Sequence, residues 1–115
     1  MSCNITTIAN FDRQAKKLAK HYPSFRKDFE AFLCELSDNP FLGTDLGNGI
    51  RKVRMTITSK GKGKSGGARI ITYNINIITQ KEDREVILLS IYDKSQQSNI
   101  SDKDIIKLKH IADNK

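Results

Sequence analysis

A change in the spacing of apolar residues near the middle of the chain restricts the fold more than any other feature. Before residue 39 the apolar residues recur at three- and four-residue intervals, the period of an amphipathic helix. After residue 50 they alternate with polar residues, as in a strand with one buried face. Pro40 and three glycines within residues 41–49 separate the two patterns. Helices followed by strands predict an α+β fold.

The first half of the chain is predicted to hold a short strand and a helical hairpin. The β-branched run at residues 5–8 indicates the strand. A first helix is expected over residues 11–22, before Pro23, and a second one begins at Ser24 as its N-cap. The apolar stripes of the two helices are Phe11, Ala15, Leu18 and Ala19, and Phe25, Phe29, Phe32, Leu33 and Leu36.

The second half is predicted to form an antiparallel sheet and a closing helix. Strands are expected over residues 52–58, 68–78 and 86–92, joined by a basic mobile loop at 59–67 and a polar turn at 80–84. Ser101 is expected to cap a helix whose apolar stripe is Ile105, Leu108, Ile111 and Ala112. The length of 115 residues suits one domain, residues 1–115.

Positive charge is concentrated in one segment of the chain. Residues 50–69 contain seven cations and no acidic residue, and the net charge of the whole chain is +7. The seven are Arg51, Lys52, Arg54, Lys60, Lys62, Lys64 and Arg69. A localised basic surface favours nucleic acid as a partner, because phosphates supply a dense array of negative charge. A lysine-rich loop that serves solubility alone is the alternative.

Several other classes of protein do not fit the sequence. The first residues lack the pattern of a secretion signal and no run of eighteen apolar residues occurs, so we expect a cytoplasmic protein with no membrane partner. Two cysteines, Cys3 and Cys34, suggest neither a disulfide framework nor a zinc site. Gly63-Lys64-Ser65 lacks the rest of a nucleotide-binding loop. We therefore expect no metal and no small-molecule cofactor.

Three stretches of the sequence resemble a branch of the RelE/ParE toxin superfamily that includes HigB-like proteins. They are Arg51-Lys52-Val53-Arg54, Gly63-Lys64-Ser65-Gly66-Gly67-Ala68-Arg69-Ile70-Ile71-Thr72-Tyr73 and Tyr92-Asp93-Lys94-Ser95. The resemblance covers most of the chain and implies a RelE-like domain that acts as the toxin of a type II toxin–antitoxin pair. It also implies a cognate antitoxin protein as partner. RelE-like toxins cleave messenger RNA, commonly in the ribosomal A site, and so inhibit translation.

The resemblance also implies site residues for a metal-independent endoribonuclease. Positions matching Lys52 and Arg54 are basic in RelE-like toxins, and the one matching Arg69 is an arginine that contacts the scissile phosphate. Lys94 matches a further basic side chain after the last strand. Arg54 and Arg69 are the expected phosphate stabilisers, because a guanidinium binds two phosphate oxygens and stays charged. Lys52 and Lys94 are the expected proton handlers.

The sequence departs from the family at one catalytic position. RelE-like toxins often have a tyrosine for proton transfer near the start of the last helix, whereas residues 98–101 contain none. Tyr73 and Tyr92 flank the expected site, although a strand tyrosine is more often a packing residue. Tyr73 is kept as a lesser catalytic candidate, and the general acid stays unassigned.

The remaining cations of the basic segment are expected to hold the RNA backbone. Arg51, Lys60, Lys62 and Lys64 are the predicted RNA-binding residues, with messenger RNA and ribosomal RNA as partners. Two alternatives stay open, since fold does not dictate function. One is a ParE-like inhibitor of DNA gyrase, and the other is an inactive module that binds RNA or the antitoxin.

Overall fold

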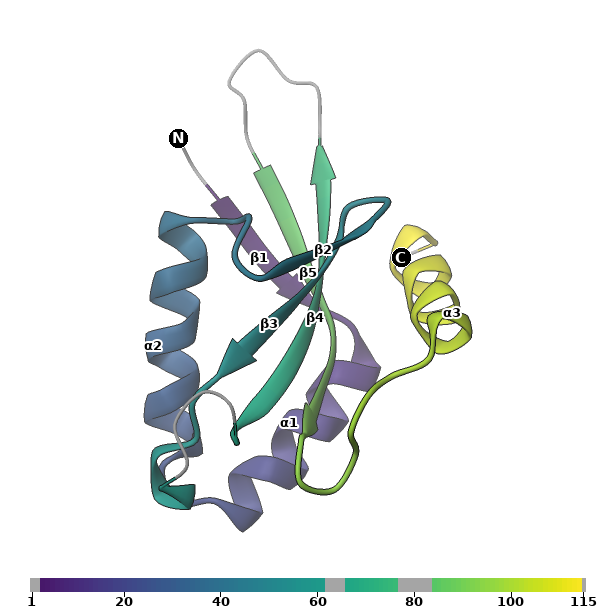
Figure 1. Cartoon of the computed structure of the whole chain (residues 1–115). Coiled ribbons are helices and arrows are strands. Elements are labelled where there is room, and N and C mark those ends of the chain that lie inside the picture. The colour runs from purple at the N-terminus through teal and green to yellow at the C-terminus, as the bar shows by residue number, and fades with distance from the viewer. Residues whose placement is uncertain (1–2, 62–65, 77–83, 115) are drawn as a thin grey trace.

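Five strands in one sheet and three helices make up the chain in the computed structural model, which describes residues 3–61, 66–76 and 84–114. The order along the chain is β1 (Cys3–Thr7), α1 (Ala9–His21), α2 (Phe25–Asp38), β2 (Thr44–Gly47), β3 (Ile50–Met55), the short 3-10 helix η1 (Thr58–Lys60), β4 (Ala68–Asn76), β5 (Arg84–Asp93) and α3 (Asp102–Asp113). The predicted α+β class is confirmed (Figure 1).

The sheet has the strand order β1-β5-β4-β3-β2. β2, β3, β4 and β5 pair antiparallel with their neighbours, as predicted for the two strands that residues 59–67 join. β1 pairs parallel with β5, so the sheet is mixed and not wholly antiparallel. The chain between β1 and β5 includes both helices and three strands, which is long enough for β5 to return parallel to β1.

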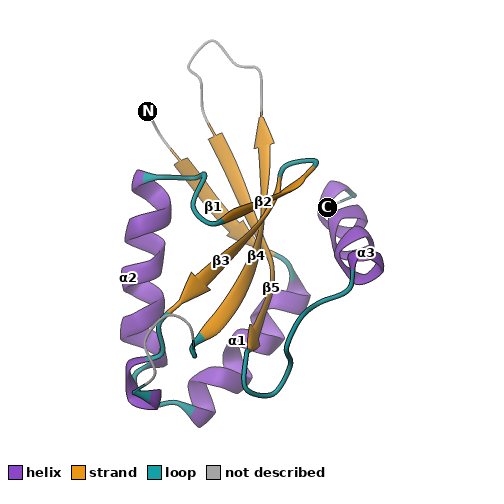
Figure 2. Ribbon diagram, in the orientation of Figure 1, coloured by secondary structure: helices purple, strands orange, loops and turns teal. Residues whose placement is uncertain are grey.

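Helices cover both faces of the sheet. α2 lies on one side and α3 on the other (Figure 2). The hairpin of α1 and α2 is confirmed, with the rings of Phe11 and Phe29 5.7 Å apart between centroids. Its buried residues are Phe11 and Leu18 on α1 and Phe25, Phe32 and Leu36 on α2.

The prediction placed two residues on the buried face of a helix where the structure has them exposed. Ala19 is exposed on α1, and Ile111 on α3 is 55% exposed. α3 packs on the sheet through Ile105 and Ala112, with Leu108 partly buried beside them. Ser101 caps α3 as predicted, because its hydroxyl accepts a hydrogen bond from the Asp104 amide at 3.1 Å.

The segment around residue 59 also differs from the prediction. β3 ends at Met55, whereas the strand was predicted to continue to residue 58. Thr58–Lys60 form η1, where the start of a mobile loop was predicted. Ser24 takes the N-cap position of α2, but its hydroxyl accepts from the Ser59 amide of η1 at 2.8 Å rather than capping the helix. Residues 62–65, and most of the predicted turn at 80–84, lie outside the described residues.

Candidate active site

Three side chains from neighbouring strands form a row across the sheet. Arg54 of β3 is directly opposite Arg69 of β4, and Arg69 is directly opposite Tyr92 of β5. Residues directly opposite each other project from the same face of a sheet, so the three side chains share one surface. Lys52 precedes Arg54 by two positions and therefore lies on that face as well.

A cleft of about 530 Å³ opens over this row. Its lining includes all four predicted catalytic cations, Lys52, Arg54, Arg69 and Lys94, together with Tyr92. Ser98 and Asn99 of the segment after β5 form one wall, and Leu42, Gly43 and Thr44 of the connection before β2 form another. Side chains separated by up to 42 positions in the sequence, from Lys52 to Lys94, thus meet at one opening.

Arg69 is the buried member of the cluster. Arg69 is 5% exposed, whereas Arg54 is exposed to solvent. Burial lowers the pKa of the Arg69 guanidinium, and the neighbouring positive charge of Arg54 lowers it further. Two arginines directly opposite on a sheet repel each other, and a bound anion between them would relieve that repulsion.

Asn99 orients Lys52 from the segment that follows β5. The Lys52 ammonium donates a hydrogen bond to the Asn99 side-chain oxygen at 2.7 Å. Sequence reasoning missed Asn99, which stands in a polar stretch with no periodicity and 47 positions from its partner. No signal in the sequence marks it.

Lys94 is placed by a backbone contact and a glycine. Its amide donates to the Gly67 carbonyl at 3.2 Å, just before β4 begins. A Cβ atom at residue 67 would lie 2.1 Å from the Met55 carbonyl oxygen, so glycine is required for this close approach. Gly67 therefore contacts the end of β3 on one side and the residue after β5 on the other.

Arg51, a predicted RNA-binding residue, contacts main-chain carbonyls at the edge of the cleft. Its guanidinium donates to the carbonyl oxygens of Leu42 at 3.0 Å and Gly43 at 2.8 Å. Both carbonyls belong to the connection that forms one wall of the cleft. Gly43 has a φ of +86°, and a Cβ atom there would lie 2.2 Å from the Lys52 carbonyl oxygen. Arg51 thus fixes the shape of the wall.

Lys60 is not in an exposed loop, which corrects the prediction for this residue. Its ammonium lies 2.5 Å from the Asp93 carboxylate, and the two side chains are 7% and 1% exposed. Asp93 also accepts hydrogen bonds from the Tyr22 hydroxyl and, at 2.7 Å, from the Ser95 hydroxyl. Lys62 and Lys64, the other predicted loop cations, lie outside the described residues.

Tyr73 lies on β4 but outside the lining of the cleft. Its hydroxyl donates to the Asp113 carboxylate at 2.7 Å, and the Lys109 ammonium lies 5.0 Å from its ring centroid. Burial raises the pKa of Tyr73, and the hydrogen bond to Asp113 raises it further. These contacts attach α3 to the sheet.

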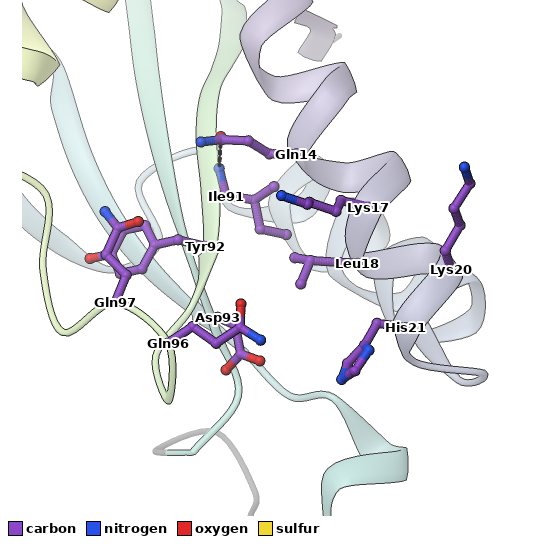
Figure 3. A pocket seen from close by; sticks show the side chains of 10 residues that line it. All are labelled: Gln14, Lys17, Leu18, Lys20, His21, Ile91, Tyr92, Asp93, Gln96 and Gln97. Atoms are coloured by element: carbon purple, nitrogen blue, oxygen red, sulfur yellow. Dashed lines mark hydrogen bonds between the residues drawn. The ribbon is translucent and has the colours of Figure 1, made fainter.

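A second cleft, of about 510 Å³, lies between α1 and the end of β5 (Figure 3). Lys17, Lys20 and His21 of α1 line one side, and Gln96 and Gln97 line the other. Tyr92 belongs to the lining of both clefts. The second cleft contains none of the predicted catalytic cations, so we place the candidate active site in the first.

The family model described as the RelE toxin of the RelE/RelB toxin–antitoxin system matches residues 10–115. The chain belongs to the RelE toxin family. The resemblance to RelE toxins is thereby confirmed, and this RelE-family chain is the toxin of a type II toxin–antitoxin system with an antitoxin as partner. Among the described residues, no helix is both long and apolar enough to cross a membrane.

Proposed function

We propose that this RelE-family toxin is a metal-independent endoribonuclease that cleaves messenger RNA on the ribosome and so inhibits translation. The observation that carries the proposal is the pairing of Arg54 with Arg69 in a cleft that Lys52 and Lys94 also line. Four cations around one opening match the charge of a phosphodiester and of its more negative transition state. The ribosome as the site of cleavage follows from the resemblance to RelE-like toxins.

The chemistry begins with attack of the RNA 2′-hydroxyl on the adjacent phosphorus. Lys52 or Lys94 accepts the proton of the 2′-hydroxyl, for which the lysine must be neutral. The bond from phosphorus to the 5′-oxygen then breaks, which leaves a 2′,3′-cyclic phosphate on one fragment and a 5′-hydroxyl on the other.

The two arginines hold the phosphate during this step. Each guanidinium offers two parallel donors to phosphate oxygens. Arg69 is fixed by burial and by a 3.3 Å hydrogen bond to the Ala68 carbonyl, whereas Arg54 is exposed at the mouth of the cleft. A buried, pre-oriented donor stabilises developing charge more than a solvated one, so Arg69 is expected to contribute more.

The test compares induced expression of wild type with Arg69→Ala, and uses Arg26→Ala as matched control. Arg26 is an exposed arginine on α2 that does not line the cleft. We expect growth arrest and new 5′ ends in cellular transcripts with wild type and Arg26→Ala, and neither with Arg69→Ala. Purified Arg69→Ala must keep its folded circular dichroism spectrum.

Other outcomes identify the alternatives. Arrest with intact transcripts and gyrase-dependent DNA damage contradicts the nuclease in favour of a gyrase inhibitor. Absence of arrest with wild type contradicts it in favour of an inactive module that binds RNA or the antitoxin.

A further inference from the structure

The hydroxyl of Tyr92 differs from those of the other tyrosines in its hydrogen bonding. The sequence contains three tyrosines, and all three are described. The hydroxyls of Tyr22 and Tyr73 each donate to a carboxylate, on Asp93 and Asp113 respectively. Tyr92 is 5% exposed, and its buried hydroxyl has no hydrogen-bond partner among the described residues.

An unpaired buried hydroxyl is unfavourable for the folded state. Such groups are rare in folded proteins, because the hydroxyl loses its water without gaining a partner. A phenylalanine would fill nearly the same volume without this cost. The position therefore holds a proton donor that has no acceptor in the part of the chain that the structure describes.

Two cations near Tyr92 can donate hydrogen bonds but cannot accept one. Its cross-strand partner in the cleft is Arg69, and a guanidinium has donors but no acceptor. Lys94, two positions further on in the same lining, is likewise a donor. An RNA phosphodiester brought into this cleft supplies acceptor oxygens to all three groups.

The proposed cleavage lacks an acid for its departing 5′-oxygen. Arginines are poor acids, because the guanidinium stays protonated across the accessible pH range. Burial raises the pKa of Tyr92, and the charge of Arg69 offsets this only in part, so the hydroxyl keeps its proton at neutral pH. A protonated donor next to the phosphate-binding arginine has the protonation state that a general acid requires.

We infer that Tyr92 is the general acid of the cleavage reaction, a role that rests on the proposed function. As the bond from the 2′-oxygen to phosphorus forms and the bond to the 5′-oxygen breaks, the proton of Tyr92 passes to the 5′-oxygen. The tyrosinate that remains lies next to the positive charge of Arg69. It regains a proton from water before the next cycle, and the lysine base releases the proton that it took.

Access to the hydroxyl requires a movement after β5. Residues 94–99 are all exposed, and they line both clefts that Tyr92 joins, with Ser98 and Asn99 in one and Gln96 and Gln97 in the other. Lys52 attaches this segment to β3 through Asn99. A phosphate that accepts a hydrogen bond from Lys52 would compete with Asn99 for the same ammonium.

The experiment compares wild type, Tyr92→Phe and Tyr73→Phe on a short messenger with one mapped cleavage position, free and on programmed ribosomes. A second messenger carries sulfur in place of the 5′-oxygen at that position. A thiolate leaves without needing a proton. Tyr73→Phe is the matched control, because it removes the hydroxyl of a strand tyrosine that does not line the cleft.

On the oxygen messenger, we expect Tyr92→Phe to lose about 10²- to 10⁴-fold in cleavage rate, the range that general acid catalysis contributes. On the sulfur messenger we expect it to match wild type. Its thermal unfolding midpoint should equal or exceed that of wild type. Tyr73→Phe should cleave both messengers as wild type does.

Three results would overturn the inference. Undiminished cleavage of the oxygen messenger by Tyr92→Phe excludes an acid role, and so does an equal loss on both messengers. Loss of cleavage by Tyr73→Phe alone assigns the acid to Tyr73. Failure of wild type to cleave either messenger is a different outcome, since it overturns the nuclease itself and the role of Tyr92 with it.

Discussion

Lys60 and Asp93 form an ion pair that is almost excluded from solvent, with 2.5 Å between the ammonium nitrogen and the carboxylate oxygen. The pair joins η1 to the end of β5, next to Lys94 of the candidate site. It therefore connects the middle of the basic segment, residues 50–69, to the strand end that lines the cleft.

We expect Lys60→Met to destabilise the protein by about 3–5 kcal/mol, because it leaves the buried carboxylate of Asp93 without its cation. Urea unfolding followed by circular dichroism measures the change. Lys20→Met, at an exposed lysine of α1, is the control and should lie within about 0.5 kcal/mol of wild type. A loss no larger than that of the control would show that the pair contributes nothing.

Stability should also depend on pH in the acid range. Burial acts to raise the pKa of Asp93, but hydrogen bonds from Lys60, Tyr22 and Ser95 outweigh it and hold that pKa well below its usual range. Hydrogen bonds from Thr58 and Ser24 likewise lower the pKa of Asp28 against the effect of burial.

The sign of this dependence follows from proton binding. The folded protein binds fewer protons at these two carboxylates than the unfolded chain, so their contribution is complete above the unfolded pKa of about 3.9. It is lost as the pH falls from there toward the folded values. Urea unfolding at pH 6, 4 and 3 should show the loss below about pH 4. Asp93→Asn should reduce it, and an unchanged dependence in that variant contradicts the assignment.

The contact between Lys52 and Asn99 offers a way to decide which lysine is the base. Asn99→Asp would place a carboxylate 2.7 Å from the ammonium and raise the pKa of Lys52. If Lys52 must be neutral to act, the rising limb of the pH–rate profile moves to higher pH. Asn99→Ala, which adds no charge, is the control. A profile that stays in place in Asn99→Asp would assign the base to Lys94.

Cleavage should proceed without a divalent metal, because the four side-chain cations can supply the positive charge that a metal ion would bring. We expect equal rates with EDTA and with magnesium, and fragments that end in a 2′,3′-cyclic phosphate. Analysis of the fragment ends by mass spectrometry distinguishes this product from a 3′-hydroxyl. Activity that disappears with EDTA and returns with magnesium would refute the mechanism.

Local patterns were sufficient to predict most of the fold. The helical hairpin, the three long strands and the capped last helix follow from apolar period and from Ser101. β2 was missed, because all four of its residues are exposed and it has no apolar alternation. Ile111 matched the period of α3, but only one side of that helix meets the sheet.

The sequence was sufficient to predict which cations form the candidate site, but not which residues these cations contact. Lys52, Arg54 and Arg69 are near in sequence and fall on two paired strands, so their meeting follows from one hairpin. Lys60 was placed wrongly, since its burial depends on Asp93, 33 positions away. The contact between Lys52 and Asn99 likewise depends on the path of the polar residues 94–99 after β5.

The end of β5 is bordered by side chains rather than by a strand. β1 stops opposite Leu88, and beyond it Asn10 donates to the Leu89 carbonyl at 3.0 Å while Gln14 accepts from the Ile91 amide at 3.0 Å. Two carboxamides of α1 thus occupy main-chain groups that an exposed edge would offer to a foreign strand. They also resist slippage of β5, since a one-residue shift would break both contacts and turn Tyr92 to the opposite face. The alignment of Tyr92 with Arg69 is therefore stabilised by α1, a helix that contributes no side chain to the lining of the cleft.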